Sequence, residues 1–303
     1  MKKFDLHIHT NTDCNLRCRH CYNYSGSGQG IRMPLEKLIR YLKFFNAFYQ
    51  SEIHLEGGEI FLYQELLSAM DQLGSELLAG ITVTSNGTVR SSDPKILNML
   101  RRIGCLRISV EGHKQDIHSA IRDSSLKQIA RNALFYQQQG IPIALRITLH
   151  ACNQDSIFKE GIPYFETLGF SRFQIYEFQS VGRGSSSIGL AVKDHFEKVL
   201  KDFADMETGA EVTLMLARRR RENIRKMEQM LAGKGVKVHY LEEANQLSVK
   251  ANGDMTVCAW DGREVIANIF DLTEIELKEL LDRHIYVHQC EFCSQVSLQK
   301  VHV

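Results

Sequence analysis

The stretch Cys14-Asn15-Leu16-Arg17-Cys18-Arg19-His20-Cys21 decides how the rest of the sequence is interpreted. It sets three cysteines directly after an apolar run at 4–9, which we expect to be a strand. A [4Fe–4S] cluster normally takes four thiolates, so three of them leave one iron free for another ligand. A zinc site needs a further ligand nearby, and His20 lies inside the run, where it is poorly placed to close such a site. The spacing therefore favours an iron–sulfur cluster over zinc.

The composition places these cysteines in a reduced compartment. The 303 residues include 8 cysteines, but the chain is neither small nor visibly secreted, because no apolar run follows Lys2 and Lys3. No run of about 18 apolar residues predicts a membrane span. We therefore expect a cytoplasmic protein, in which spaced cysteines are typical of metal ligands or reactive thiols. A net charge of +1 provides no general attraction for a nucleic acid or an anionic membrane, and we expect neither as a partner.

Short apolar runs alternate with longer amphipathic stretches over the first two thirds of the chain. Strands are expected at 4–9, 52–56, 81–85, 106–110, 143–149 and 173–178. Helices are expected at about 34–50, 62–75, 94–103, 125–140 and 155–168, although Pro163 makes the last one doubtful. This order is typical of a parallel sheet covered by helices. About six units fit, fewer than the eight of a full barrel, so we predict an α/β fold with a partial (β/α)6 barrel.

Several of these strands carry a polar face towards their C-terminal ends. The residues concerned are His54 and Glu56; Arg107, Ser109 and Glu111; and Arg146, Thr148 and His150. The outer face of such a sheet is covered by helices, so polar side chains there are unfavourable. We therefore expect these side chains to point inward and to line a ligand cavity at the C-terminal rim.

The pattern changes in the last third of the chain. A strand is expected at 211–216, a helix at 218–232, and a hairpin around Asn252-Gly253. Thr273 and Glu276 form a capping box before a further helix. We predict a barrel domain at 1–208 followed by a small α+β domain at 209–303.

Further motifs at successive strand ends carry a family resemblance. They are Gly57-Gly58-Glu59, Thr84-Ser85-Asn86-Gly87, Ser109-Val110-Glu111-Gly112, Arg122 and Val181-Gly182-Arg183-Gly184. Together with the cysteine triad, over residues 4–184, they resemble the radical S-adenosylmethionine (SAM) superfamily. One such motif is weak, but this many in the same order make a chance match improbable.

The resemblance implies a set of cofactor-binding residues. Cys14, Cys18 and Cys21 would hold a [4Fe–4S] cluster. SAM would contact His20, Gly57, Gly58, Glu59, Ser85, Asn86, Ser109, Glu111, Arg122, Arg146 and Val181. In such enzymes an electron, supplied by a reductant such as flavodoxin or ferredoxin, cleaves SAM to a 5′-deoxyadenosyl radical, which abstracts a hydrogen atom from the substrate. The resemblance therefore implies an oxidoreductase.

A second group of cysteines lies near the C-terminus. Cys258, Cys290 and Cys293 resemble the twitch or SPASM extension of radical SAM enzymes, which holds auxiliary iron–sulfur clusters. Two departures limit the match: 241–245 contain no cysteine, and the further cysteines of a full SPASM domain are missing beyond Cys293. We expect one auxiliary cluster at most, with an exogenous ligand, the substrate, Cys152 or Glu243 as its fourth ligand. Two alternatives to an auxiliary cluster remain open. The cysteines could form a zinc site with His284 or His288, or they could be buried without any ligand.

Other residues leave alternatives. We expect Cys105, at the start of a strand, in the core. Cys152 follows a strand at the active rim. Three roles are open for it: a buried thiol without function, a hydrogen-atom donor, or a ligand of the auxiliary cluster. The run Arg218–Arg221 is a solvated helix face or a docking strip for an acidic leader peptide. His7 and His9 resemble the opening of a metal-dependent phosphoesterase, although a structural role in the strand is favoured.

The resemblance favours a ribosomally made peptide as substrate, modified by thioether or carbon–carbon crosslinking or by epimerisation. The alternative is a dehydrogenase or rearrangement enzyme acting on a sugar, cyclitol or cofactor precursor. A non-catalytic electron carrier is disfavoured, because it needs none of the SAM-contact segments. Because the first strand is expected at about residue 4, we expect no leader-recognition module before it, and a peptide would then need the barrel rim, an edge strand or a separate leader-recognition protein.

Overall fold

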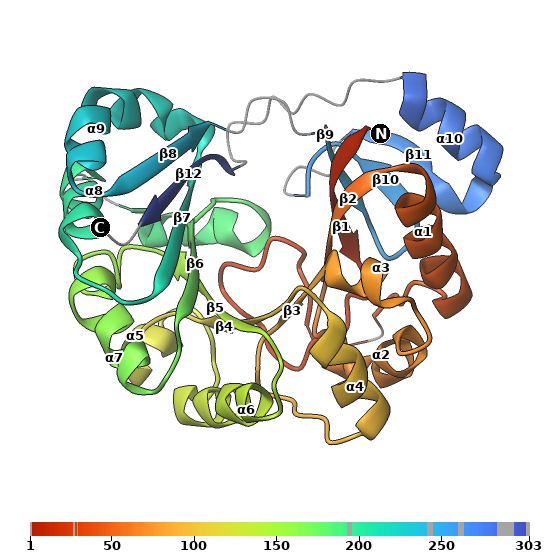
Figure 1. Cartoon of the computed structure of the whole chain (residues 1–303), viewed down its shortest axis with the longest axis horizontal. Coiled ribbons are helices and arrows are strands. Elements are labelled where there is room, and N and C mark those ends of the chain that lie inside the picture. Colours follow the sequence, from red (N-terminus) through yellow and green to blue (C-terminus); the bar gives the residue numbers. More distant parts are fainter. Residues whose placement is uncertain are drawn as a thin grey trace.

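A computed structural model describes residues 2–26, 28, 30–192, 196–240, 245–259, 264–283 and 294–300. Within these residues the strands form one sheet, in the order β11-β10-β9-β1-β2-β3-β4-β5-β6-β7-β12-β8. Figure 1 shows that this sheet is curved, with the helices on its outer side. No helix in the described part of the chain is long and apolar enough to cross a membrane.

Parallel strands in chain order make up the middle of the sheet. They are β1 (Lys3–His9), β2 (Gln50–Glu56), β3 (Ile81–Ser85), β4 (Cys105–Val110), β5 (Ile143–Leu149), β6 (Arg172–Glu177) and β7 (Glu211–Ala217). The α/β fold and the partial barrel are therefore confirmed. The parallel run extends through β7, one strand further than expected, because Val212 and Leu214 are buried and β7 pairs with β6.

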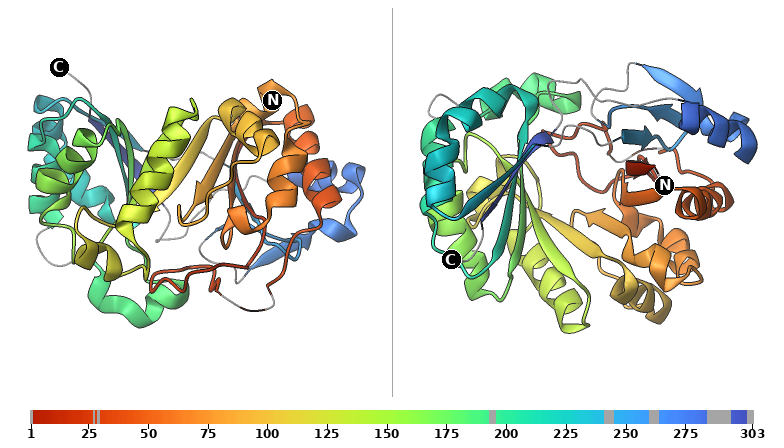
Figure 2. Two further views of the ribbon diagram at one scale, coloured as in Figure 1. Left: turned by 90° about the horizontal axis from the view of Figure 1, so that it is seen from below. Right: turned by 45° about the horizontal axis from the view of Figure 1, so that its top comes forward.

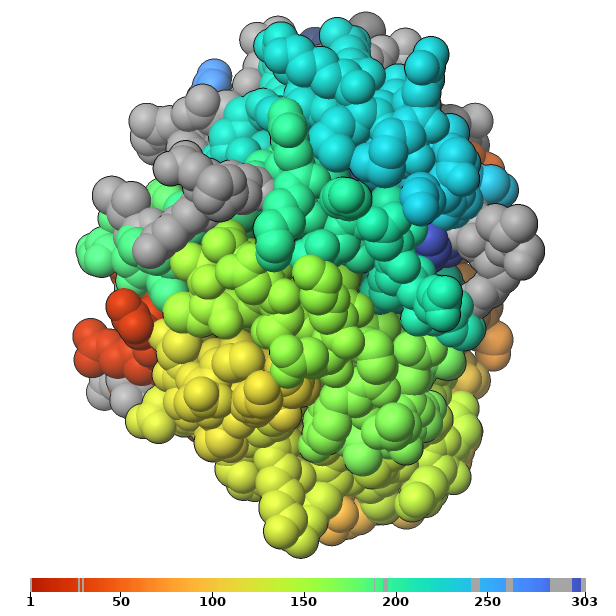
Figure 3. Space-filling model, turned by 90° about the vertical axis from the view of Figure 1, so that its left-hand side faces the viewer, coloured from red at the N-terminus to blue at the C-terminus, as the bar shows by residue number. Residues whose placement is uncertain are grey.

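Helices follow these strands and cover the outside of the sheet. They are α1 (Leu35–Phe48), α2 (Gln64–Met70), α3 (Ser75–Ala79), α4 (Pro94–Arg102), α5 (Gln115–Ser119), α6 (Leu126–Gln138), α7 (Ile162–Thr167) and α8 (Phe196–Asp205). The doubtful helix at 155–168 is divided: a π-helical turn at Ile157–Gly161 precedes α7, and Pro163 lies in the first turn of α7, where its missing N–H costs least. Figure 3 shows one face of this outer layer, from α5 and α6 below to α9 (Arg221–Gly233) above.

The segment after β7 contributes to both edges of the sheet. β8 (Val236–Tyr240) and β12 (Ser294–Lys300) lie beyond β7 in antiparallel pairs. On the far edge, β9 (Asn245–Val249) pairs with β1 in parallel, followed by the antiparallel β10 (Asp254–Thr256) and β11 (Val265–Asn268), with α10 (Glu274–Arg283) beside them. Figure 2 shows these two parts on opposite sides of the barrel opening. The division into domains at residue 208 stays a prediction.

The two faces of β1 explain why the barrel has an apolar outside and a polar inside. Phe4, Leu6 and Ile8 alternate along the strand and are fully or almost fully buried beneath the outer helices. Burying such a side chain contributes about 1.5–3 kcal/mol. The residues between them belong to the opposite face, where Asp5, His7 and His54 of the neighbouring strand form an ionic cluster. The polar inward face predicted from the alternation is therefore present.

Candidate functional site

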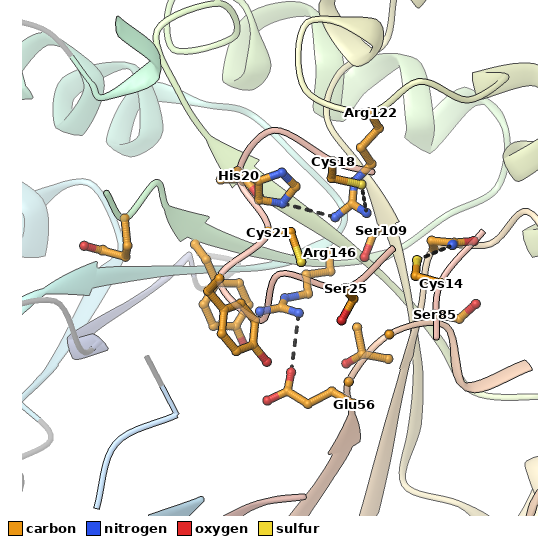
Figure 4. Close-up of a pocket in the computed structure, with 18 of the residues that line it drawn as sticks. Cys14, Cys18, His20, Cys21, Ser25, Glu56, Ser85, Ser109, Arg122 and Arg146 are labelled. Atoms are coloured by element: carbon orange, nitrogen blue, oxygen red, sulfur yellow. Dashed lines mark hydrogen bonds and ion pairs between the residues drawn. The ribbon is translucent and has the colours of Figure 1, made fainter. Parts of the chain in front are cut away.

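A pocket opens at the C-terminal ends of the barrel strands (Figure 4). Of the predicted site residues, Cys14, Cys18, His20, Cys21, Gly57, Gly58, Ser85, Asn86, Ser109, Arg122 and Arg146 line it. They come from the loop after β1 and from the ends of four further strands or the segments that follow them. Parallel strands bring their C-terminal ends to one rim, which is why residues far apart in the sequence meet here.

The three cysteines lie in the loop that follows β1. The backbone N–H of Cys14 donates to Gly26 O at 3.2 Å, and that of Cys21 donates to Cys18 O at 3.2 Å. Burial raises the pKa of Cys14 to about 11 and also raises the pKa of Cys18. Thiols in such a setting stay neutral unless a metal stabilises the thiolate. Three soft donors that share one pocket therefore fit the open-sided iron–sulfur cluster that the resemblance implies.

Two glycines let the loop after β2 lie directly against the cysteine loop. A Cβ on Gly58 would overlap the carbonyl oxygen of Asp13, and one on Gly57, whose φ is +141°, would overlap that of Asn11. The same segments are joined by hydrogen bonds from Gly58 N to Asn11 O and from Glu59 N to Asp13 O, each 2.7 Å long. Only glycine permits this backbone contact, so both glycines position the cysteine loop as well as line the pocket.

Glu59 lies behind the lining of the pocket, and its contact with SAM stays a prediction. Its side chain is fully buried and is not part of the pocket lining. One carboxylate oxygen accepts from Phe61 N at 3.0 Å and from Ser85 Oγ at 2.8 Å, and the other accepts from Asn86 N at 2.7 Å. Burial raises the pKa of Glu59 despite these bonds. The carboxylate thus joins the loop after β2 to the end of β3, and we interpret it as a brace.

Glu111 plays a similar part on the other side of the pocket. Its fully buried carboxylate accepts from Arg122 Nε at 2.5 Å and from Thr148 N at 3.0 Å, and it is not in the pocket lining. Burial opposes its ionisation, but Arg122 outweighs this and lowers the pKa of Glu111 to about 2. Arg122 also contacts Cys18 Sγ at 3.6 Å and His20 Nε2 at 3.3 Å. Glu111 therefore orients the arginine that lies beside the cysteines.

The Val181–Gly184 turn contacts the cysteine loop from the side of β6. Gly182 has a φ of +57°, and a Cβ there would overlap the backbone of Tyr22. Arg183 N donates to Cys21 O at 3.0 Å, and Arg183 Nε donates to Cys18 O at 3.0 Å. Val181 itself is partly exposed and lies outside the pocket lining.

Glu56 and Thr148, which the polar alternation predicts on the inward face, also line the pocket, as does Thr84 of the motif that follows β3. The lining further contains residues that the sequence reasoning did not name as site residues: Tyr22, Ser25, Tyr176, Glu177, Phe178 and Gln179. The same alternation could have identified Tyr176, because it lies on the inward face of β6. Arg219 and Arg220, read as part of a solvated or docking run, instead pair with Glu177 at 2.9 and 2.8 Å.

The remaining predicted cysteines are placed only in part. Cys258 is buried, whereas Cys290 and Cys293 lie outside the described residues, so the auxiliary cluster site stays a prediction. Cys152 is exposed and is not among the residues that line the pocket. Its role as a hydrogen donor also stays a prediction. Cys105 is buried in β4, as expected.

Comparisons with known proteins agree with this geometry. The model of the radical SAM superfamily matches residues 8–156. The sporulation killing factor maturation protein SkfB of Bacillus subtilis (strain 168) is 25% identical over 194 residues, which is 62% of this chain and 45% of SkfB. The chain thus spans less than half the length of that curated relative.

Solved structures share the fold at low sequence identity. SuiB of Streptococcus suis bound to S-adenosylmethionine has a TM-score of 0.69 at 14% identity, covering 94% of this chain and 67% of SuiB. The same protein bound to its precursor peptide SuiA has a TM-score of 0.67 at 14% identity, covering 92% and 64%. The structure of anSMEcpe with bound AdoMet and the Cp18Cys peptide has a TM-score of 0.63 at 18% identity, covering 92% and 80%.

The family match, the shared barrel and the pocket built around the three cysteines lead to the same assignment. Residues 8–156 of this chain are therefore similar to the radical SAM superfamily.

Proposed function

We propose that this protein is a radical SAM enzyme that modifies a ribosomally made peptide. The observation that carries the proposal is the pocket in which Cys14, Cys18 and Cys21 meet Gly57, Gly58 and Ser109. When bound there, a [4Fe–4S] cluster with SAM would supply the radical that abstracts a hydrogen atom from the substrate.

The residues of the chain would bind, orient and shield these groups. The three cysteines would hold the cluster, and the glycines of the loop after β2 would let the backbone approach SAM. Arg122, held by Glu111, adds a positive charge beside the thiolates, which favours an anionic cluster. Tyr22, Phe178 and Tyr176 would form apolar walls that limit the access of water to the radical.

The relatives support a peptide as substrate. SkfB is a maturation protein for a killing factor, and SuiB has been seen bound to a precursor peptide. The edges of the sheet and the barrel rim offer places for a peptide, and a separate leader-recognition protein would supply further contacts. A reductant such as flavodoxin or ferredoxin would deliver the electron.

Release of 5′-deoxyadenosine tests the enzyme class. The reconstituted protein, reduced under anaerobic conditions with SAM, should release 5′-deoxyadenosine, and Cys14→Ala should abolish the release. Cys105→Ala is the matched control, because it removes a buried thiol in β4 that is not part of the pocket lining. Undiminished release from Cys14→Ala would show that the pocket is assigned to the wrong chemistry.

Coexpression with candidate precursor peptides tests the substrate class. Mass spectrometry should show a loss of two hydrogens for a crosslink, or an unchanged mass with deuterium taken up from solvent for epimerisation. Turnover of a sugar or cyclitol, with no change in any peptide, would favour the small-molecule alternative.

We also propose that Cys258, Cys290 and Cys293 hold one auxiliary cluster. Two [4Fe–4S] clusters predict about eight irons per chain after reconstitution, falling to about four in Cys258→Ala. A wild-type value of about four, together with bound zinc, would point to a zinc site at these cysteines instead.

A further inference from the structure

Two apolar side chains are exposed on the outer side of the segment between β1 and α1. Tyr24 is 65% exposed and Ile31 is 53% exposed. The backbone N–H of Ile31 donates to Thr12 Oγ1 at 2.9 Å, and Thr12 and Tyr24 line the same cavity, so the two exposed side chains lie on one side of the loop. Exposed apolar side chains that gather in one place are typical of a surface that contacts another molecule.

The backbone of Tyr24 is strained. Its φ is +52°, and among the described residues it is the only one other than glycine with a positive φ. This left-handed region is uncommon for a bulky residue, whereas glycine adopts it without strain. Strained residues are concentrated at functional sites, so the exposed ring of Tyr24 points to a role at the surface.

A cavity of about 230 Å³ opens beside Tyr24, and it is positively charged. It is lined by Thr12, Arg17, Tyr24, Arg183 and three glycines. Residues 10–34 include three arginines but one acidic residue, Asp13, which pairs with Arg32 at 2.7 Å. Arg17 is exposed, and it has no ion pair within the described part of the chain. The cavity therefore presents a local positive charge in a chain whose net charge is only +1.

This surface lies directly behind the three cysteines. Arg183 extends from the cavity to the cysteine loop, where its Nε donates to Cys18 O and its backbone N–H donates to Cys21 O, each at 3.0 Å. Tyr24 is exposed at the cavity, whereas the next residue, Ser25, is buried and lines the pocket together with the cysteines (Figure 4). One layer of chain therefore separates the surface from the pocket in which the cluster would bind.

The position and the charge of this surface fit a protein that delivers an electron. Radical chemistry in the pocket needs an electron from outside the chain, and transfer is fastest where the least protein separates donor and acceptor. At about 230 Å³ the cavity is smaller than the roughly 300–1,000 Å³ of small-molecule sites, but it can receive carboxylate side chains of a partner. Complexes between electron-transfer proteins are small and transient, and opposite charges speed their formation.

We propose that the surface formed by Arg17, Tyr24, Ile31 and Arg183 docks an acidic electron-transfer protein. The proposal rests on the proposed function, because it takes the three cysteines behind this surface to hold the cluster. One electron leaves the reduced partner and enters the cluster, no bond forms or breaks, and no proton has to cross the surface. The two arginines would pair with carboxylates of the partner, and Tyr24 and Ile31 would form the apolar part of the contact.

Binding of flavodoxin, an acidic flavoprotein, provides a test that does not depend on turnover. Calorimetry would use oxidised flavodoxin and the reconstituted enzyme, without SAM and under anaerobic conditions. Arg17→Glu and Ile31→Glu should each raise the Kd about fivefold or more, and added salt should weaken binding to wild type more than binding to Arg17→Glu. Tyr24→Gly should also weaken binding but should not lower Tm, because glycine relieves the strain. Arg131→Glu is the matched control: it reverses an exposed arginine on α6 and should change the Kd less than about twofold.

The source of the electron separates docking from damage to the pocket. Release of 5′-deoxyadenosine is measured once with limiting reduced flavodoxin and once with dithionite, a small reductant that needs no docking surface. Arg17→Glu and Ile31→Glu should slow the release with flavodoxin about fivefold or more. Both variants should leave the iron content and the release with dithionite unchanged.

The outcomes are distinct. If both variants bind and use flavodoxin as wild type does, or if wild type binds no flavodoxin, the docking proposal is overturned and the proposed function stays intact. Equal losses with flavodoxin and dithionite would also overturn it, because the two residues would then act through the cluster site. If wild type releases no 5′-deoxyadenosine even with dithionite, the proposed function fails and this proposal fails with it.

Discussion

Replacing Glu59 by glutamine tests whether its carboxylate holds two loops together or binds SAM directly. The Glu59 carboxylate accepts three hydrogen bonds, from Phe61, Ser85 and Asn86. Its side chain is not part of the pocket lining. A glutamine can keep the first two bonds with its amide oxygen. Its NH₂ group then faces the N–H of Asn86, so one charge-assisted bond becomes a contact between two donors.

The magnitude follows from that count. A hydrogen bond to a charged group contributes about 1.5–3 kcal/mol, and an unsatisfied buried donor costs about 1–3 kcal/mol. We expect Glu59→Gln to lower the free energy of unfolding by about 3 kcal/mol. For a chain of this size, about 2 °C of Tm per kcal/mol gives a fall of about 6 °C.

Thermal unfolding of the reconstituted enzyme at a fixed scan rate measures this fall. Glu65→Gln, an exposed change in the first turn of α2, should shift Tm by less than about 1 °C. The affinity for S-adenosylhomocysteine should fall only modestly in Glu59→Gln, through the displacement of Asn86. A Tm within about 2 °C of wild type, combined with a large loss of affinity, would refute the brace and restore the direct SAM contact that the resemblance implies.

Other predictions follow from the same geometry. Gly58→Ala should prevent formation of a cluster-loaded enzyme, measured as iron content, because its Cβ would overlap the Asp13 carbonyl; normal iron content would show that the loop can move aside. Burial lowers the pKa of His118 from an ordinary value near 6.5 to about 4, so the unfolded state binds more protons between these values. Tm should therefore fall as pH drops from 6.5 to 4, and His118→Gln should reduce the fall; an unchanged slope would contradict this. If Cys152 donates a hydrogen atom, Cys152→Ala should uncouple 5′-deoxyadenosine release from product formation while leaving the iron content unchanged; an unchanged ratio of product to 5′-deoxyadenosine would show that this exposed thiol is not the donor.

The spacing of apolar and polar residues was enough to predict the partial barrel and its polar inward face. His54, Ser109 and Arg146 lie on β2, β4 and β5, which belong to one run of parallel strands in chain order, so that order determines which side chains share a rim. These assignments depend on the period of a strand and on the direction of its ends, and both can be read from a sequence. The resemblance to the radical SAM superfamily, and not the strand pattern, is what implied a common site for the three cysteines, Gly57 and Gly58.

The roles of individual charged residues were harder to predict. Glu56 and Glu59 are three residues apart in one motif, and their residue type does not show which one faces the pocket. That depends on the positive φ of Gly57, which lets Glu56 stay on the inward face while Glu59 turns beneath the loop. Arg219 and Arg220 look like solvated residues because their partner, Glu177, is about 42 residues earlier in the chain.

The sequence pattern also did not predict that the strands after β7 extend both edges of the sheet. The hairpin around Asn252-Gly253 was correctly expected, and β9 and β10 form it. However, β9 is too short for its pattern to show that it pairs with β1 at the opposite end of the chain. Pairings over such a distance depend on which sheet edge is unpaired in the assembled fold.

The pairing of β1 with β9 has a consequence for the order of events during synthesis. Asp5 and Gln246 are hydrogen-bonded across this pair but are separated by 241 residues. At about 5–20 residues per second, a ribosome needs roughly 12–48 s to make the intervening chain. During that interval the outer edge of β1 exposes unpaired backbone groups, directly before the loop that carries the cysteines. The edge of β1 therefore needs protection from other chains until β9 has been made.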